Sequence, residues 1–173
     1  MRVLGIDPSL QSTGFGIVEN RGNGLQAIAY GIIKPKRQAD FPQRLNEIRI
    51  ELEKLIDNFV PEEVSIENPF FARNVRTAIS LGQVRGAILI AVASRHCSLF
   101  EYSALEIKKA VTGYGQAEKD QVQRMVKILL NLEDEHMSLD SSDALAAAIC
   151  HLYHRDLAIK IKENSENFKK EIK

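Results

Sequence analysis

The sequence predicts an α/β protein with a five-stranded mixed sheet flanked by helices. Three observations lead to this fold class. The first is a series of three short apolar segments near the N-terminus, separated by turns rich in glycine and asparagine. The second is a change to helical spacing of apolar residues from residue 41 onward. The third is a later alternation of helix and strand, which is typical of a sheet that contains parallel strands.

The size and charge of the chain limit the classes of protein to consider. It has 173 residues, 45% of them hydrophobic, which is enough for the core of one domain. We assign residues 1–155 to this domain and residues 156–173 to a polar tail, helical or disordered, rich in Lys, Glu and Asn. The 23 Lys and Arg balance the 23 Asp and Glu. This balance argues against a protein wrapped in nucleic acid on all sides, but it does not exclude one with a single basic face.

The sequence also predicts a cytoplasmic protein. Cys97 and Cys150 both lie in apolar surroundings, so we expect buried, reduced thiols and no disulfide. The N-terminus lacks the pattern of a signal peptide, and no apolar run is expected to be long enough to span a bilayer. We therefore expect no membrane association.

The first predicted strand, residues 3–6, ends at an acid. Pro8 removes a backbone donor directly after Asp7, so the strand stops at this carboxylate. An acid at the tip of a rigid strand is what a metal or phosphate site requires. An Asp before Pro is also a common turn residue, and this stretch alone leaves both interpretations open.

The other elements follow in chain order. Strands at residues 15–18 and 27–33 complete an antiparallel meander, and apolar residues at helical spacing predict a helix over 41–59. Beyond Pro61, the pattern predicts a strand at 64–67, a helix at 73–95, a strand at 98–102, helices at 103–111 and 118–130, and a final core helix from residue 140.

The helix at residues 73–95 has an unusual composition. Gly82 and Gly86 are four residues apart, so they share a face and allow another element to approach closely. The stretch 87–93 is entirely apolar. This helix is therefore either buried in its own chain or paired with a partner.

Four acids are predicted to meet at one edge of the sheet. If the strand at 64–67 lies parallel to the first strand and beside it, Asp7 and Glu67 share the carboxyl edge, where ligands bind in open α/β sheets. Asp140 and Asp143 face the same way in the first turn of the last helix. Helix capping by Asp140 or Ser141 is the structural alternative. Four converging carboxylates repel one another, and Mg²⁺ ions relieve that repulsion.

Six short motifs support a family resemblance. They are Val3-Leu4-Gly5-Ile6-Asp7-Pro8-Ser9, Ile66-Glu67, Leu81-Gly82-Gln83-Val84-Arg85-Gly86, Phe100-Glu101-Tyr102, Gly115-Gln116-Ala117-Glu118-Lys119 and Asp140-Ser141-Ser142-Asp143-Ala144-Leu145-Ala146. In this order and at these separations, they resemble the RuvC family of bacterial Holliday junction resolvases, which have a ribonuclease H-like fold. The resemblance extends from residue 1 to about residue 155.

The resemblance implies a catalytic site. Asp7, Glu67, Asp140 and Asp143 correspond to the family's four catalytic acids, which would bind two Mg²⁺ ions per active site, with Mn²⁺ able to substitute. Some relatives have His at the third of these positions, where this chain has Asp140. The implied reaction is paired, symmetric nicking of a four-way junction in DNA recombination and repair, leaving 5′-phosphate and 3′-hydroxyl ends.

The resemblance also implies DNA contacts and partners. Phe70 corresponds to an aromatic residue that wedges into the junction core, and the adjacent Phe71 is the alternative. Lys108 and Lys119 match basic residues that grip DNA, although a solvated lysine is the simpler explanation without the resemblance. A homodimer and cooperation with the RuvA–RuvB branch-migration complex are further implications. Additional candidate phosphate contacts, chosen from the residues themselves, are Arg73, Arg76 and Arg124.

Two other functions compete with a nuclease. Actin-like sugar kinases and ATPases also begin with an acid on the first strand, but they need a second copy of the fold, for which 173 residues leave no room. A non-catalytic junction-binding module would keep a basic face without needing four converging acids. His151 and His154 have metal-pair spacing, but they lie more than two helical turns from Asp143 and are expected to be ordinary core or surface residues.

Overall fold

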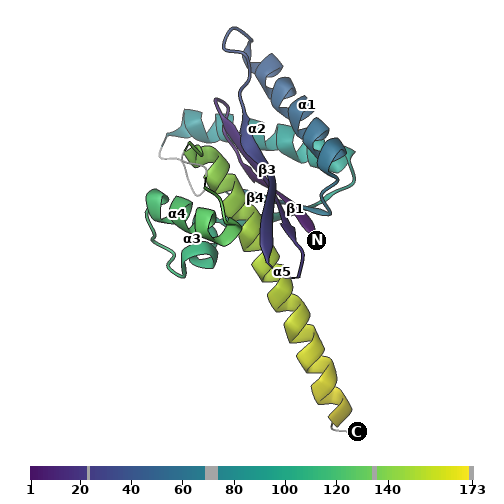
Figure 1. The fold of residues 1–173 in the computed structure, drawn as a ribbon. Helices are drawn as coiled ribbons and strands as arrows, with labels where there is room; N and C mark the ends of the chain where they lie inside the picture. Colours follow the sequence, from purple (N-terminus) through teal and green to yellow (C-terminus); the bar gives the residue numbers. More distant parts are fainter. Residues whose placement is uncertain (23, 69–73, 134–135, 172–173) are drawn as a thin grey trace.

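A computed structural model describes residues 1–22, 24–68, 74–133 and 136–171, with the backbone alone considered for 166–171. It confirms the predicted five-stranded mixed sheet, in the order β3-β2-β1-β4-β5 (Figure 1). The strands are β1 (Arg2–Asp7), β2 (Thr13–Asn20), β3 (Leu25–Ile33), β4 (Glu63–Asn68) and β5 (Ser98–Ser103). The helices are α1 (Phe41–Phe59), α2 (Val75–Ser94), α3 (Ala104–Thr112), α4 (Lys119–Leu130) and α5 (Leu139–Glu171).

The sheet lies between two layers of helices (Figure 1). Successive strand residues point to opposite faces. Leu4 therefore packs in a core with residues of α1 and α2, whereas Val3 packs in a second core with residues of α3, α4 and α5. The pairing of β1 is antiparallel with β2 and parallel with β4, as the meander and the helical crossover predict. This arrangement brings the carboxyl ends of β1 and β4 together.

Helix α5 packs directly on the backbone of the first two strands. A Cβ atom added to Gly5 would lie 2.0 Å from the carbonyl oxygen of Ala144, and one added to Gly14 would lie 2.0 Å from that of Asp140. Side chains at these two positions are therefore impossible without moving the helix. The two glycines allow the start of α5 to lie against the end of β1 and the start of β2, where Asp7 pairs with Gly14.

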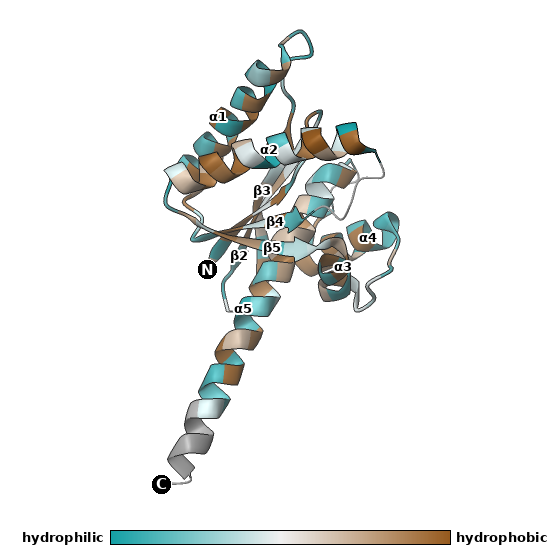
Figure 2. Ribbon diagram, turned by 180° about the vertical axis from the view of Figure 1, so that it is seen from behind, coloured by the Kyte–Doolittle hydropathy of each residue, from teal (hydrophilic) through white to brown (hydrophobic). Residues whose placement is uncertain are grey.

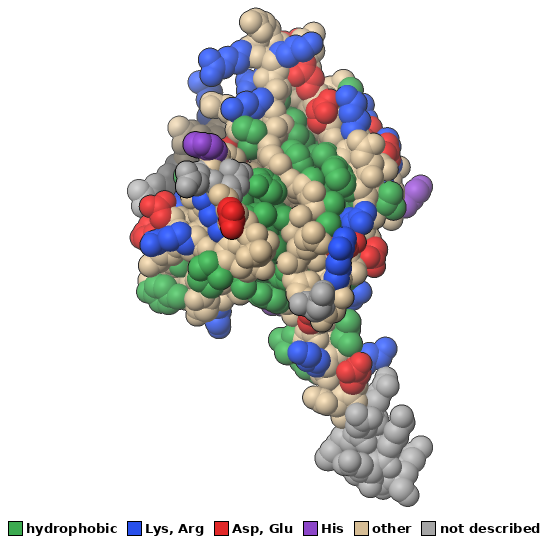
Figure 3. All heavy atoms as spheres, in the orientation of Figure 1, with side chains coloured by type: hydrophobic (Ala, Val, Ile, Leu, Met, Phe, Trp, Pro, Cys, Tyr) green, Lys and Arg blue, Asp and Glu red, His purple; other side chains and the backbone are tan. Residues whose placement is uncertain are grey.

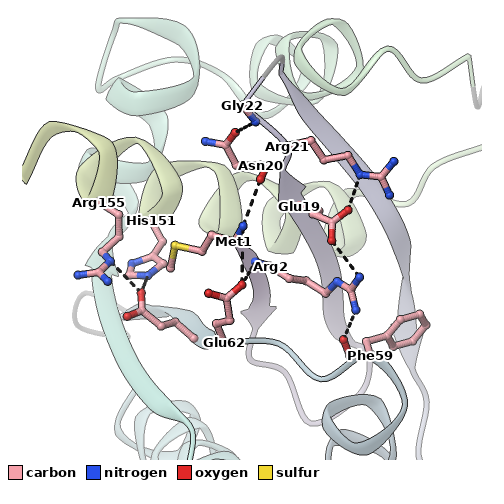
Figure 4. Close-up of polar contacts among 11 residues, drawn as sticks. Met1, Arg2, Glu19, Asn20, Arg21, Gly22, Phe59, Glu62, His151 and Arg155 are labelled. Atoms are coloured by element: carbon pink, nitrogen blue, oxygen red, sulfur yellow. Dashed lines mark hydrogen bonds and ion pairs between the residues drawn. The ribbon is translucent and has the colours of Figure 1, made fainter. Parts of the chain in front are cut away.

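Polar contacts connect the elements at the opposite end of the strands, where β1 begins (Figure 4). Arg2 donates to the side chain of Glu19 at 2.9 Å and to the backbone carbonyl of Phe59. His151 is fully buried, and its ring nitrogens contact Glu63 at 2.5 Å and the Tyr102 hydroxyl at 2.7 Å. The expectation that His151 belongs to the core, away from the acids, is therefore confirmed.

Helix α2 differs from the sequence-based expectation about membranes. Within the described part of the chain, Val75–Ser94 is the one helix long and apolar enough to cross a bilayer by length and composition alone, and only 22% of its apolar stretch is buried. The prediction that no segment meets this criterion is wrong. One side of α2 packs on α1 and the sheet, and hydrophobic residues also continue along its free side (Figure 2). Exposed apolar residues on α2 include Val75, Ile79 and Ile90.

Both cysteines are free thiols, as predicted. Cys150 is buried, whereas Cys97, which was also expected to be buried, is only partly so. Burial raises the pKa of the Cys150 thiol to about 12, so this side chain stays protonated and unreactive at neutral pH.

Candidate active site

Asp7 is the last residue of β1 and faces α5. Residues 3, 5 and 7 share one face of the strand, and Gly5 on that face touches α5. The turn after Asp7 is fixed locally, because the Thr13 hydroxyl donates to the carbonyl oxygen of Ser9 at 2.5 Å. The backbone N–H of Ser9 in turn reaches the Thr13 hydroxyl at 3.4 Å. These bonds explain how a short turn holds the carboxylate at a defined place on the sheet edge.

Glu67 reaches the same edge from the neighbouring strand. β4 runs parallel to β1, with Ile66 opposite Ile6, so both strands end side by side. Glu63 lies on the same face of β4 as Glu67 and contacts His151 of α5. Glu67 therefore also faces α5, and it is half-buried.

Asp140 and Asp143 occupy the first turn of α5. The helix is capped by Ser138, two residues before Asp140, whose hydroxyl accepts from the backbone N–H of Ser141 at 3.2 Å. The alternative of Asp140 or Ser141 as the cap is therefore wrong, and Ser138 was missed by the sequence analysis. The sequence pattern that indicates this cap is a Ser two residues before Asp140. With capping supplied by Ser138, the two carboxylates are left for another role.

The electrostatics show that the four acids influence one another. Burial, followed by the carboxylates of Asp143, Glu67 and Asp140, raises the pKa of Asp7 to about 8. Burial, followed by Asp143, also raises the pKa of Glu67. At neutral pH, a large share of Asp7 is consequently protonated in the absence of a cation. Such a cluster is unfavourable unless a positive charge occupies it.

One positive charge in the cluster comes from Lys119, the first residue of α4. Its ammonium lies 2.9 Å from Oδ2 of Asp143. This hydrogen bond raises the pKa of Lys119, and the lysine charge opposes the upward pKa shifts of Asp7 and Glu67. Lys108 acts on Glu67 in the same direction. The structure thus places both lysines beside the acids, a juxtaposition that spacing in the sequence does not reveal.

Carboxylate oxygens are the donors that Mg²⁺ and Mn²⁺ prefer, so the donor chemistry of the cluster fits a hard divalent cation. Across the described ranges of the chain, however, the structure contains no group of three or more His, Cys, Asp or Glu side chains already arranged to hold a metal ion. The ion pair with Lys119 engages one of the candidate ligands, Asp143.

The structure shows no contact between the remaining described candidates and the acid cluster. Arg76 is exposed in the first turn of α2, and Arg124 is exposed on α4. Phe70, Phe71 and Arg73 fall outside the described residues. His154 lies beside Tyr102, with ring centroids 5.0 Å apart, and takes no part in the acid cluster.

Comparisons with known proteins identify the family. The family model for crossover junction endodeoxyribonuclease RuvC matches residues 3–151. The chain is 44% identical over 164 residues to the crossover junction endodeoxyribonuclease RuvC of Alkaliphilus metalliredigens, covering 94% of this chain and all of that protein. It is 46% identical to the protein of the same name from Geotalea uraniireducens, covering 87% of this chain and 88% of the relative.

Solved structures give the same result. The structure of T. thermophilus RuvC in complex with Holliday junction substrate matches with a TM-score of 0.86 and 29% identity, over 91% of this chain and 96% of the other. The yeast mitochondrial Holliday junction resolvase Ydc2, at 14% identity and a TM-score of 0.60, shares the fold over 86% of this chain and 75% of the other. The chain thus belongs to the RuvC family of crossover junction endodeoxyribonucleases.

Proposed function

We propose that the protein is a divalent-cation-dependent endonuclease that resolves four-way DNA junctions. The observation that carries the proposal is the partly buried cluster of Asp7, Glu67, Asp140 and Asp143 at the carboxyl edge of the sheet. The family supports the substrate, since relatives are named crossover junction endodeoxyribonucleases and a structural relative is bound to a Holliday junction.

In this proposal the four acids hold two Mg²⁺ ions, with Mn²⁺ as a substitute. When bound, the ions supply Lewis acidity at the scissile phosphate. The strand carboxylates of Asp7 and Glu67 set the position of the site, because the sheet fixes both side chains. Asp143, which comes from α5, would hold a cation in place of its contact with Lys119. The lysine ammonium would then be available to contact a DNA phosphate.

A non-catalytic junction-binding module is the second candidate, and the acid cluster disfavours it. A module that only grips phosphates gains nothing from a cluster that holds the pKa of Asp7 near 8, because negative charge repels the DNA backbone. A nuclease requires such a cluster to bind its cations. The unfavourable charge is therefore explained by catalysis and not by binding.

Incubation with a synthetic four-way junction tests the function. With Mg²⁺ or Mn²⁺, we expect paired nicks at symmetric positions, with 5′-phosphate and 3′-hydroxyl ends, and no cleavage in EDTA. A linear duplex of the same sequence is the control and should remain largely uncut. Junction binding without cleavage in either metal would favour the non-catalytic module, and equal cutting of the linear duplex would contradict junction selectivity.

Further DNA contacts are proposed around the same edge. Arg76, Lys108 and Arg124 supply positive charge for the phosphate backbone, and this type of contact positions DNA without reading its sequence. We also propose that Phe70 wedges into the junction core, as the family resemblance implies, and that Arg73 is a phosphate contact. We also propose that the protein works in the bacterial cytoplasm with the RuvA–RuvB complex and without a membrane.

We further propose a homodimer formed through the free side of α2. A four-way junction has two-fold symmetry, so one active site per chain requires two chains to make two matched nicks. A Cβ atom added to Gly82 or Gly86 would meet nothing within 4 Å in this chain. The glycines are therefore not needed for packing within the monomer. They lie among exposed apolar residues, of which Ile79 is 59% exposed and Ile90 is 60% exposed.

The variant Gly82→Leu tests this interface. We expect it to shift the protein from dimer to monomer in sedimentation while its melting temperature as a monomer is not reduced, because the site is open and Leu favours helix. Gly82→Ala, which adds one methyl group, is the matched control and should remain mostly dimeric. A Gly82→Leu protein that sediments as a dimer at the same concentrations would place the interface elsewhere.

A further inference from the structure

A second concave site lies at the same sheet edge as the acids, on the side of α1. It is a hollow of about 580 Å³, formed where the loop between β1 and β2 meets the loop between β3 and α1. Its lining consists of Gln11, Ser12, Lys34, Pro35, Arg37 and Arg44. We refer to these six residues as the basic pocket.

The basic pocket is strongly positive for its size. Three of its six residues are cations and none is an acid. Among the described residues, no carboxylate forms an ion pair with Lys34, Arg37 or Arg44. Figure 3 shows Lys and Arg side chains gathered at the end of the molecule that carries the loop between β3 and α1. An uncompensated group of cations in a hollow favours an anionic ligand.

Arg44 connects this pocket to the turn that positions the catalytic edge. Its Nη2 donates to the carbonyl oxygen of Leu10 at 2.8 Å, whereas its buried Nε has no hydrogen-bond partner. A buried guanidinium N–H without a partner is costly, so the charge of Arg44 is not fully compensated within the described residues. Two acids close to these residues in the sequence accept hydrogen bonds from backbone N–H groups instead, Asp40 from Gln43 at 2.9 Å and Glu47 from Lys36 at 2.8 Å.

The position of the pocket indicates which anion it serves. Gln11 and Ser12 belong to the turn that begins directly after Asp7, and Lys34 follows the end of β3, where Ile33 pairs with Thr13 of β2. The pocket and the acid cluster therefore lie along one edge of one sheet, on opposite sides of this turn. Because the pocket borders the turn that follows Asp7, the phosphate backbone of DNA is the anion that the proposed function brings to this end of the sheet.

We propose that the basic pocket binds the phosphate backbone of the junction arm that leads away from the active site. The proposal rests on the proposed function and extends it, because none of these residues belongs to the acid cluster or to the basic residues on α2, α3 and α4. Lys34 and Arg37 contact phosphates directly. Arg44 adds positive charge to the pocket and holds the turn through its hydrogen bond to the carbonyl oxygen of Leu10. Gln11 and Ser12 donate hydrogen bonds to phosphate oxygens.

The double variant Lys34→Ala/Arg37→Ala tests the pocket. Both side chains are exposed, so the melting temperature should not change. Binding to a four-way junction is measured in EDTA, to prevent cleavage, across a range of salt concentrations. We expect the dissociation constant to rise roughly tenfold near physiological salt. In a plot of the logarithm of the dissociation constant against the logarithm of the salt concentration, the slope should fall by about two.

The matched control removes the same charge elsewhere. Lys160→Ala/Lys162→Ala lies on the projecting part of α5, where both side chains are exposed, and should change binding less than twofold. A second variant, Lys34→Arg/Arg37→Lys, retains the charge and should retain the salt slope.

Each outcome decides the proposal. A loss of junction affinity in Lys34→Ala/Arg37→Ala but not in the control pair supports DNA binding by the pocket. Equal weakening of binding in both alanine pairs would mean that only net charge matters. Unchanged binding in the pocket variant would mean that DNA does not reach the pocket. Either result overturns the proposal. If the unaltered protein fails to bind junctions at all, the proposed function itself is wrong, and the pocket loses its ligand with it.

Discussion

Replacing any one of the four acids by its amide is expected to abolish junction cleavage while junction binding persists. Asp7→Asn, Glu67→Gln, Asp140→Asn and Asp143→Asn each keep the shape of the side chain and remove its charge. An amide is a poor ligand for Mg²⁺, so each variant should lose cleavage by at least roughly 10²–10³-fold. Affinity for the junction comes mainly from phosphate contacts made by basic residues, and removing a negative charge from the cleft does not weaken those contacts.

Single-turnover cleavage of a labelled junction measures the first effect, and binding in EDTA measures the second. Asp120→Asn is the matched control, because Asp120 is also an acid in the first turn of a helix but is exposed on α4. It should cleave like the unaltered protein. An acid variant that retains near-normal cleavage would remove that residue from the proposed catalytic group. Loss of binding together with cleavage would indicate that the acid supports the fold of the cleft instead.

The sequence predicts the sheet and the meeting of its two strand acids because both depend on general rules. Short apolar runs mark β1 and β4, and Pro8, directly after Asp7, marks the end of β1. A helix between two neighbouring strands then makes them parallel, which places Asp7 and Glu67 at one edge. The i,i+3 spacing of Asp140 and Asp143 supplies the shared direction of these two acids.

Other features of the site depend on how separate elements approach in three dimensions. The contact of Lys119 with Asp143 joins the starts of α4 and α5, and no local pattern connects the two residues. The basic pocket combines a turn after β1, a loop after β3 and a helix residue, Arg44, which are distant in the sequence. Similarly, only the structure shows that the glycines of α2 face outward, because helical spacing places them on one face without saying which.

The variant Asp7→Asn is also expected to make the protein more stable in metal-free buffer near neutral pH. The pKa of Asp7 is raised from 3.8 to about 8 in the folded protein, mainly by burial and then by neighbouring carboxylates. Between these two pH values the folded state holds a proton that the unfolded state has released. The free energy of unfolding therefore falls as pH rises, with a slope approaching 1.4 kcal/mol per pH unit, as proton linkage requires.

Asparagine has no proton to lose, so the variant escapes this penalty. At pH 7.5 in EDTA we expect a gain on the order of 2–4 kcal/mol in the free energy of unfolding, or roughly 5–10 °C in melting temperature. The gain should shrink towards zero as the pH falls below 3.8, where Asp7 is protonated in both states. Asp57→Asn is the control, because the pKa of Asp57 is shifted in the opposite direction: its hydrogen bond with Arg95 lowers that pKa. Removing the charge of Asp57 should therefore give no stabilisation.

Adding Mg²⁺ completes the test, because a cation relieves the same repulsion that the substitution removes. The unaltered protein should gain melting temperature with Mg²⁺, and Asp7→Asn should gain less, so the two proteins converge as the metal concentration rises. A pH-independent difference between them would show that the charge of Asp7 is not what destabilises the cleft. A variant that melts below the unaltered protein at pH 7.5 would show that the carboxylate contributes more to the fold than its burial costs.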